Sequence, residues 1–153
     1  MTQTAPDTRQ PDTAAVRHSM IFVNLPVEDV AASREFFTRV GYSFDEEMCN
    51  GSGLAVELGP NHFAMLLQRD FFATFHTART ARAGDHEVLT CLSAESRAEV
   101  DLVVDRAVAA GGVEGRRQDE GFMYGRTYTD LDGHVWEIMW MDVDAARDAG
   151  AFG

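Results

Sequence analysis

The feature that most constrains this chain is an internal repeat. Residues 61–68, NHFAMLLQ, align with residues 133–140, GHVWEIMW, so that His62 falls on His134. Around each copy, the apolar spacing predicts the same order of elements, β-α-β-β-β. One such half has a single helix and a single sheet face, which is too little core for about fifty residues to fold alone. The sequence therefore predicts an α+β fold in which two modules share one core.

The first half carries clear signals for a strand followed by a helix. Residues 20–27, MIFVNLPV, place apolar side chains on one face in the alternation of a strand. Asp29 is suited to cap a helix over residues 30–40, and Gly41 is suited to end it. Three strand-like runs follow, separated by turn sequences: YSFDEEM, LAVEL and HFAMLLQ.

The second half repeats this order. Residues 86–93, HEVLTCLS, are predicted to form its first strand. Ser96 and Glu99 form a capping box at the start of a helix that Gly111 and Gly112 end. Three further strands are expected from VEGRRQD, YGRTYTD and HVWEIMWMD.

These signals predict one domain with a tail at each end. The connector holds Phe71 and Phe75 at helical spacing, and it is expected to pack on the core; the alternative is a lid or a dimer contact. The tails have no apolar period, and the N-terminal one is expected to be flexible. The predicted boundaries are the N-terminal tail at 1–18, the domain at 19–142 (module one 20–68, connector 69–84, module two 85–142) and the C-terminal tail at 143–153.

Composition excludes several classes of partner. The net charge of −12 argues against nucleic acid and anionic membranes, because phosphate binding needs a basic surface. No apolar stretch approaches the ~20 residues that span a bilayer, and the N-terminus has no secretory h-region. Cys49 and Cys91 are isolated, without zinc-ligand spacing. We therefore expect a cytoplasmic protein with reduced thiols.

Three segments carry a resemblance to a known family. FVNLPVEDVAASREFFTRVGYSF is similar to the opening strand, V-x-D turn and helix of the vicinal oxygen chelate superfamily, which includes glyoxalases, bleomycin resistance proteins and extradiol dioxygenases. DLDGHVWEI is similar to its closing motif, with Leu131 where proline is usual. The third is the duplicated element order. The resemblance covers about residues 20–142 and implies a curved mixed sheet around a ligand cup, a small-molecule ligand and a homodimer.

The resemblance also implies four positions for metal ligands. In the metal-dependent members, these lie at the start of each module's first strand and in the middle of its last strand. Carried over residue by residue, they are Phe22, Met65, Glu87 and Glu137, with His86 in place of Glu87 if the register shifts by one. Phe22 cannot bind a metal, and two carboxylates without histidine are a poor set for Zn²⁺, Ni²⁺ or Fe²⁺. No cofactor is therefore expected, with a divalent metal as the alternative.

Glu137 is unusual because it interrupts an apolar run. A period of two places it with Val135 and Met139 and sends both tryptophans to the other face. The resemblance implies that Glu137 faces the cup, as a catalytic base or a metal ligand. The alternatives are that Glu137 faces water or pairs with an arginine.

Five residues are candidates for ligand binding. Phe22, Asn24 and Met65 are expected to line a mostly apolar cup, although Phe22 and Met65 could instead fill the core. Tyr124 and Arg126 share a strand face and could contact an anionic or planar ligand. The alternative for this pair is cross-strand packing with an arginine at the surface.

The turn before the last strand is expected to be structural. Asp130, Asp132 and Gly133 have the composition of a hairpin turn. His62 and His134 follow equivalent turns, which indicates structural or surface roles.

Two functions from different classes fit these observations. The first is a binding protein that holds a small molecule in the apolar cup, independent of metal or weakly dependent on it. The alternative is a metal-dependent glyoxalase-like lyase or isomerase, or a dioxygenase, using Glu137 and Glu87.

Overall fold

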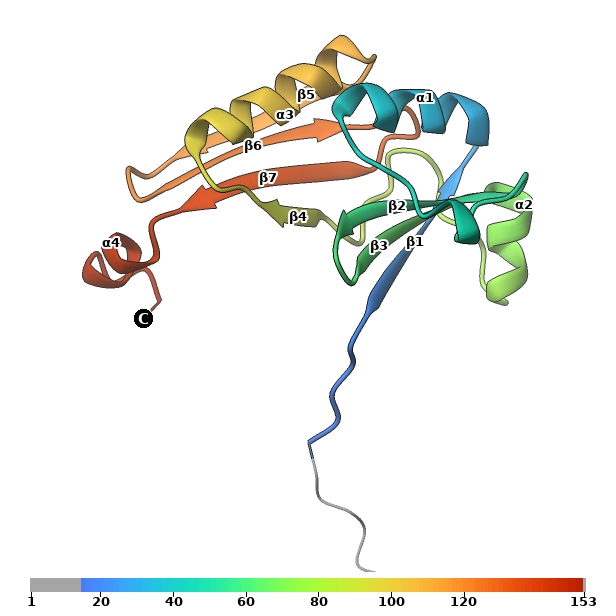
Figure 1. Ribbon diagram of the computed structural model, residues 1–153, viewed down its shortest axis with the longest axis horizontal. Helices are drawn as coiled ribbons and strands as arrows, with labels where there is room; N and C mark the ends of the chain where they lie inside the picture. Colours follow the sequence, from blue (N-terminus) through green and yellow to red (C-terminus); the bar gives the residue numbers. More distant parts are fainter. Residues whose placement is uncertain (1–14, 153) are drawn as a thin grey trace, which may run out of the picture.

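The computed structural model describes residues 15–152 and contains two mixed β-sheets, with the two long helices on the same side of both (Figure 1). The first sheet has the order β1-β3-β2, from β1 (Ile21–Val27), β2 (Gly53–Gly59) and β3 (His62–Gln68). The second has the order β4-β7-β6-β5, from β4 (Thr90–Ser93), β5 (Val113–Asp119), β6 (Met123–Thr129) and β7 (Val135–Met141). In each sheet the module's first strand runs parallel to its last. The predicted α+β class is confirmed, and the predicted order β-α-β-β-β is found in the second module, whereas the first module has the order β-α-β-β.

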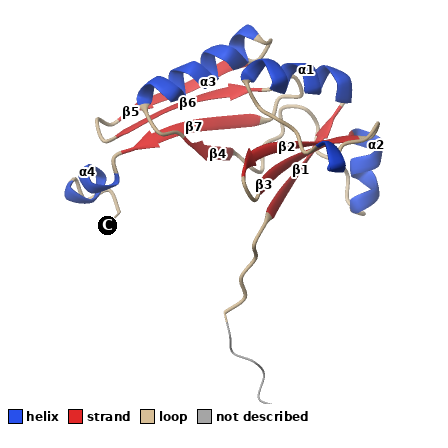
Figure 2. Cartoon of the chain, in the orientation of Figure 1, coloured by secondary structure: helices blue, strands red, loops and turns tan. Residues whose placement is uncertain are grey.

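The helix boundaries follow the predicted caps. In α1 (Val30–Val40), the Asp29 carboxylate accepts a hydrogen bond from the backbone N–H of Ala32 at 2.9 Å, and Gly41 ends the helix at a φ of 115°. In α3 (Arg97–Ala109), the Ser96 hydroxyl accepts from the N–H of Glu99 at 3.1 Å. Both helices cover one side of the strands, which leaves most of the opposite sheet faces uncovered (Figure 2).

Two predictions about elements are wrong. YSFDEEM forms no strand: Phe44 makes one isolated bridge to Val56, and Glu46–Met48 is a 3₁₀ turn capped by the Asp45 carboxylate. The segment 86–89 is exposed coil, and β4 begins only at Thr90, where it meets the edge of β7. The C-terminal tail contains a short helix, α4 (Val143–Asp148). Residues 1–14 of the predicted N-terminal tail lie outside the described part, and residues 15–20 are exposed without strand or helix.

The connector is short helix followed by loop. It contains α2 (Arg69–Phe72) and a 3₁₀ turn at Ala73–Phe75, after which the chain crosses to β4 (Figure 1). Phe71 and Phe75 contact each other edge to face at 5.1 Å, and Phe75 is 65% exposed. Within residues 15–152, no helix is long and apolar enough to cross a membrane.

The two modules share one core on the helix side. Phe37 of α1 packs edge to face on Trp136 of β7, with ring centroids 5.4 Å apart, and Phe36 lies against Tyr128 of β6 at 6.3 Å. Trp136 and Tyr128 are fully buried. Aromatic side chains of this size contribute large buried apolar areas, so α1 packs on the second sheet as well as on its own.

One buried carboxylate closes the turn before β7. Oδ1 of Asp130 accepts from the backbone N–H groups of Asp132 and His134 at 3.0 Å. Oδ2 accepts from Nε1 of Trp136 and contacts Nδ1 of His134, both at 3.0 Å. Gly133 has a φ of 85°, a conformation that favours glycine. Asp130 therefore fixes the turn and the orientation of the core tryptophan together.

We expect Asp130→Ala to lower the free energy of unfolding by about 3 kcal/mol, because it leaves several buried donors without an acceptor. Urea unfolding followed by circular dichroism measures this change. Asp144→Ala is the control, since that side chain is 91% exposed in α4. A loss no larger than that of the control would show that water replaces the Asp130 carboxylate.

Candidate functional site

The open face of the first sheet is apolar. Phe22 pairs with Phe63 and Asn24 with Met65 in the β1–β3 register, so all four side chains lie on the face away from the helices. The Phe22 and Phe63 rings are stacked, 5.3 Å apart and 15° from parallel. Phe22 is 44% exposed and Phe63 is buried beneath it. Three of the residues that were candidates for ligand binding, Phe22, Asn24 and Met65, therefore share one accessible face.

The open face of the second sheet holds Glu137 between two neutral neighbours. Thr127 of β6 lies opposite Glu137 on one side, and Cys91 of β4 lies opposite it on the other. Burial and the nearby Glu137 carboxylate raise the pKa of Cys91 to about 11, so this thiol stays protonated at neutral pH. Among the described residues, Glu137 makes no ion pair, which contradicts the alternative that it pairs with an arginine there.

The strand register corrects one of the four inferred ligand positions. Met65 pairs with Asn24, and its counterpart Glu137 pairs with Cys91, so Asn24 and Cys91 are equivalent. Two residues before Asn24 is Phe22, and two residues before Cys91 is Leu89. The structural counterpart of Phe22 is thus Leu89 and not Glu87, which lies two residues further from β4 in exposed coil.

The corrected set does not fit a transition metal. Phe22, Met65, Leu89 and Glu137 offer one oxygen donor, whereas such ions in proteins take three or four nitrogen, oxygen or thiolate ligands. His86, the substitute if the register shifts, lies outside β4 like Glu87. In residues 15–152, no group of three or more histidines, cysteines or carboxylates is arranged to hold a metal ion.

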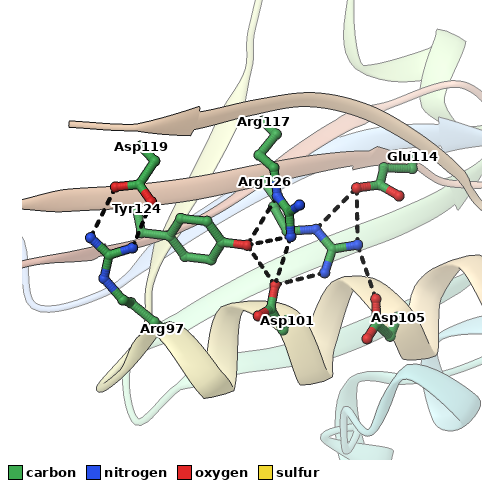
Figure 3. A network of polar contacts seen from close by, with 8 residues as sticks. All are labelled: Arg97, Asp101, Asp105, Glu114, Arg117, Asp119, Tyr124 and Arg126. Carbon is green, nitrogen blue, oxygen red and sulfur yellow. Dashed lines mark hydrogen bonds and ion pairs between the residues drawn. The ribbon is translucent and has the colours of Figure 1, made fainter. Parts of the chain in front are cut away.

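Tyr124 and Arg126 were predicted to line the cup, and this prediction is wrong. Both lie on the helix-covered face of β6, where they are buried against α3 (Figure 3). Nη1 of Arg126 donates to Asp101 at 2.8 Å and Nε donates to Glu114 at 3.0 Å, while Nη2 lies 2.9 Å from Asp105. The Tyr124 hydroxyl donates to Asp101 at 2.7 Å. Gly125 and Thr127 occupy the open face of β6 instead.

The network around Arg126 extends along α3. Arg117 donates to the Tyr124 hydroxyl at 2.6 Å, and Arg97 pairs with Asp119 at 2.8 Å (Figure 3). The Tyr124 hydroxyl lowers the pKa of Asp101, with help from Arg126, and the Arg97 guanidinium lowers the pKa of Asp119 to about 2. These contacts satisfy the charges within the protein, so the face serves packing. Asp101 and Asp105, spaced four apart beside the apolar stripe of α3, are the sequence signal that could have indicated it.

A cavity of about 340 Å³ lies where the connector passes between the modules. Its walls come from the end of β1, α2, the connector loop and the turn before β7, and they include three of the predicted site residues, Asn24, His86 and Glu87. Phe22, Met65 and Glu137 are not part of it. Sequence reasoning missed this cavity because a loop without regular structure forms most of its wall.

Comparison with known proteins gives a consistent picture of the fold. Residues 20–56 match the family model described as bleomycin resistance protein-like, N-terminal. A glyoxalase-related enzyme from Fulvimarina pelagi superposes with a TM-score of 0.69 at 21% identity, covering 82% of this chain and 88% of that one. No curated protein gave a significant match.

Two further solved structures belong to proteins whose names state a function. The fosfomycin resistance protein from Listeria monocytogenes has a TM-score of 0.61 at 15% identity, covering 84% of this chain and 98% of that one. A lactoylglutathione lyase from Agrobacterium tumefaciens has a TM-score of 0.59 at 17% identity, covering 81% of this chain and 94% of that one. At these identities, the likeness establishes the shared fold.

We expect Arg126→Ala to lower the free energy of unfolding by about 2 kcal/mol, because it leaves three carboxylates around an emptied, buried position. Arg126 is 6% exposed, whereas the control Arg147 is 67% exposed in its pair with Asp144. Arg147→Ala should change stability by less than about 0.5 kcal/mol. Urea titration compares the two variants, and equal effects would contradict a structural role for Arg126.

Proposed function

We propose that this chain, whose fold and opening segment confirm its resemblance to the vicinal oxygen chelate superfamily, binds a small, mostly apolar molecule on the open faces of its sheets. Binding does not require a tightly held transition metal. The observation that carries the proposal is the accessible stack of Phe22 on Phe63, at a position where metal-dependent relatives would need a ligand atom.

The Phe22–Phe63 stack supports ligand binding for a simple reason. A half-exposed aromatic ring held rigidly by a second ring offers a flat apolar surface whose conformational cost is already met by the fold. Met65 lies beside it and can adapt to an irregular ligand, because its unbranched thioether is flexible. Asn24 adds one polar group that can orient the ligand.

Glu137 places a carboxylate on the open face of the second sheet. Its carboxylate can accept a hydrogen bond from a ligand hydroxyl or N–H, or hold a cationic group. Thr127 and Cys91 flank it and carry no charge at neutral pH. Together with the net charge of −12, this favours a neutral or cationic ligand on the open faces over a phosphate or phosphonate.

The metal-dependent lyase or dioxygenase receives less support. The four inferred positions provide one carboxylate, and Glu87, its expected partner, lies in exposed coil outside β4. A lyase of this kind would use Glu137 as the proton-transfer base, which the accessible face allows. It would need metal ligands from outside the four inferred positions.

A second copy of the chain would complete the cup. β1 and β4 are edge strands of separate sheets and do not pair with each other, so each leaves one row of backbone groups unpaired within the chain. Ile21, the first residue of β1, and Leu89, which directly precedes β4, are 53% and 60% exposed. Pairing β1 of one copy with β4 of another would bury both and bring the two open faces together. We therefore propose a homodimer.

Binding is tested by NMR of methyl-labelled, metal-free protein titrated with neutral aromatic fragments, bleomycin and fosfomycin. We expect saturable shifts of the Met65 methyl signal with at least one neutral aromatic or cationic compound. Phe22→Ala should weaken that binding about tenfold, because the stacking surface is lost. Phe75→Ala removes another exposed ring outside the sheet faces and should leave the affinity within about twofold.

Two outcomes of this titration would contradict the proposal. One is the absence of Met65 shifts with every compound. The other is binding or turnover that appears only after Zn²⁺ or Ni²⁺ is added and is lost in Glu137→Gln, which would support the lyase instead.

The dimer is tested by light scattering of the purified chain and of two charged variants. We expect Ile21→Asp and Leu89→Asp to convert a dimer to a monomer, because each would place a carboxylate in the buried seam. Val113→Asp is the matched control, since Val113 is 65% exposed on the outermost strand of the second sheet. A native chain that is monomeric at high concentration would contradict the proposed assembly.

A further inference from the structure

The cavity at the connector adjoins the open face of the first sheet, with which it shares Asn24, but most of its wall comes from other segments. It lies between the end of β1, α2, the connector loop and the turn before β7, and it is about 340 Å³ in volume. That volume lies at the lower end of the range of small-molecule sites, which is about 300–1,000 Å³. Glu137, Phe22 and Met65 are absent from its walls.

Two arginines at this cavity have guanidinium groups without a partner in the described part of the chain. Arg79 and Arg82 line it, and within residues 15–152 neither guanidinium group makes an ion pair or a hydrogen bond. Arg69, the third arginine of the wall, is occupied: Nη2 donates to the carbonyl of Ala81 at 2.8 Å, and Nε lies 3.2 Å from Glu28. Arg69 thereby fixes the loop that carries the other two.

The acidic groups of the wall do not occupy these arginines. Asp85 accepts from the backbone N–H of Arg82 at 3.1 Å, and Asp132 accepts from the backbone N–H of Glu28 at 2.8 Å. Burial raises the pKa of Asp132 above its usual value. Glu87 is the remaining acid and is exposed.

The remainder of the wall is apolar or neutral. The apolar side chains of the wall are Leu25, Pro26, Phe72, Ala81, Ala83, Val88 and Val135. Of the histidines, His76 contacts the Thr80 hydroxyl at 3.2 Å and His134 is held by Asp130. A ligand that suits this site has an apolar body for these side chains and one planar anionic group for a guanidinium.

We propose that the connector cavity is a second binding site, which takes small carboxylates with an apolar body. The carboxylate pairs with Arg79 and Arg82, and the body packs on Phe72 and Val88. In a chain of net charge −12, anions are repelled from most of the surface, so recognition depends on these two side chains. The site does not depend on the ligand of the open faces.

Benzoate and benzamide are matched probes, because they share size and ring and differ in the anionic group. Titration of ¹⁵N-labelled full-length protein should give saturable shifts with benzoate at millimolar affinity or tighter. The affinity for benzamide should be at least about tenfold lower, since benzamide lacks the charge-assisted contacts. The shifts should concentrate at Thr80, Ala81, Val88 and Val135, and spare Phe22 and Thr127.

Variants assign the effect to the two arginines. Arg79→Ala and Arg82→Ala should each weaken benzoate binding several-fold, and the double variant about tenfold or more. Arg116→Ala removes an exposed arginine of β5 outside the cavity and should leave the affinity within about twofold. Because all three arginines are on the surface, circular dichroism should show native folding in every variant.

Several results would overturn this proposal. They are equal affinities for benzoate and benzamide, unchanged affinity in the double variant, shifts confined to the open faces, or no saturable benzoate binding. None of them bears on the Met65 titration, so the two proposals can fail separately.

Discussion

The contact between Phe37 and Trp136 determines how the rest of the molecule is arranged. It joins the helix of one module to the last strand of the other, and the Asp130 carboxylate fixes the tryptophan by accepting a hydrogen bond from its Nε1. Because both helices pack on this shared core, the side chains on the helix-covered face of each sheet are buried and do not contact a ligand. The faces left over carry Phe22, Met65 and Glu137, so the location of the accessible surface follows from the core.

This division explains why two arginines on the same chain have different roles. Arg126 lies on the covered face, where three carboxylates from α3 and β5 meet its guanidinium group. Arg79 and Arg82 lie on a loop beside a cavity, and no carboxylate of the described chain pairs with their guanidinium groups. The charge of a buried arginine must be neutralised by acidic groups of the protein, whereas the charge of an arginine beside a cavity can be neutralised by an anionic ligand.

The sequence was a good guide wherever the signal was local. The bounds of α1, the caps at Asp29 and Ser96, and the β-α-β-β-β order of the second module follow from spacing and capping chemistry. It was a poor guide wherever the outcome depended on a distant partner. The alternation predicts correctly that Tyr124 and Arg126 share one face of a strand, but the packing of α3 determines that this face is buried. Likewise, the start of β4 is set by its pairing with β7. The connector cavity has no periodic signal at all.

The shared core also has a consequence for how the chain acquires its structure during synthesis. Phe37 emerges from the ribosome about a hundred residues before Trp136, so α1 has no complete packing partner until translation is almost finished. Contacts of such long sequence separation slow folding, because the chain entropy is lost before the contact energy is gained. The aromatic face of α1 therefore lacks its packing partner for most of translation.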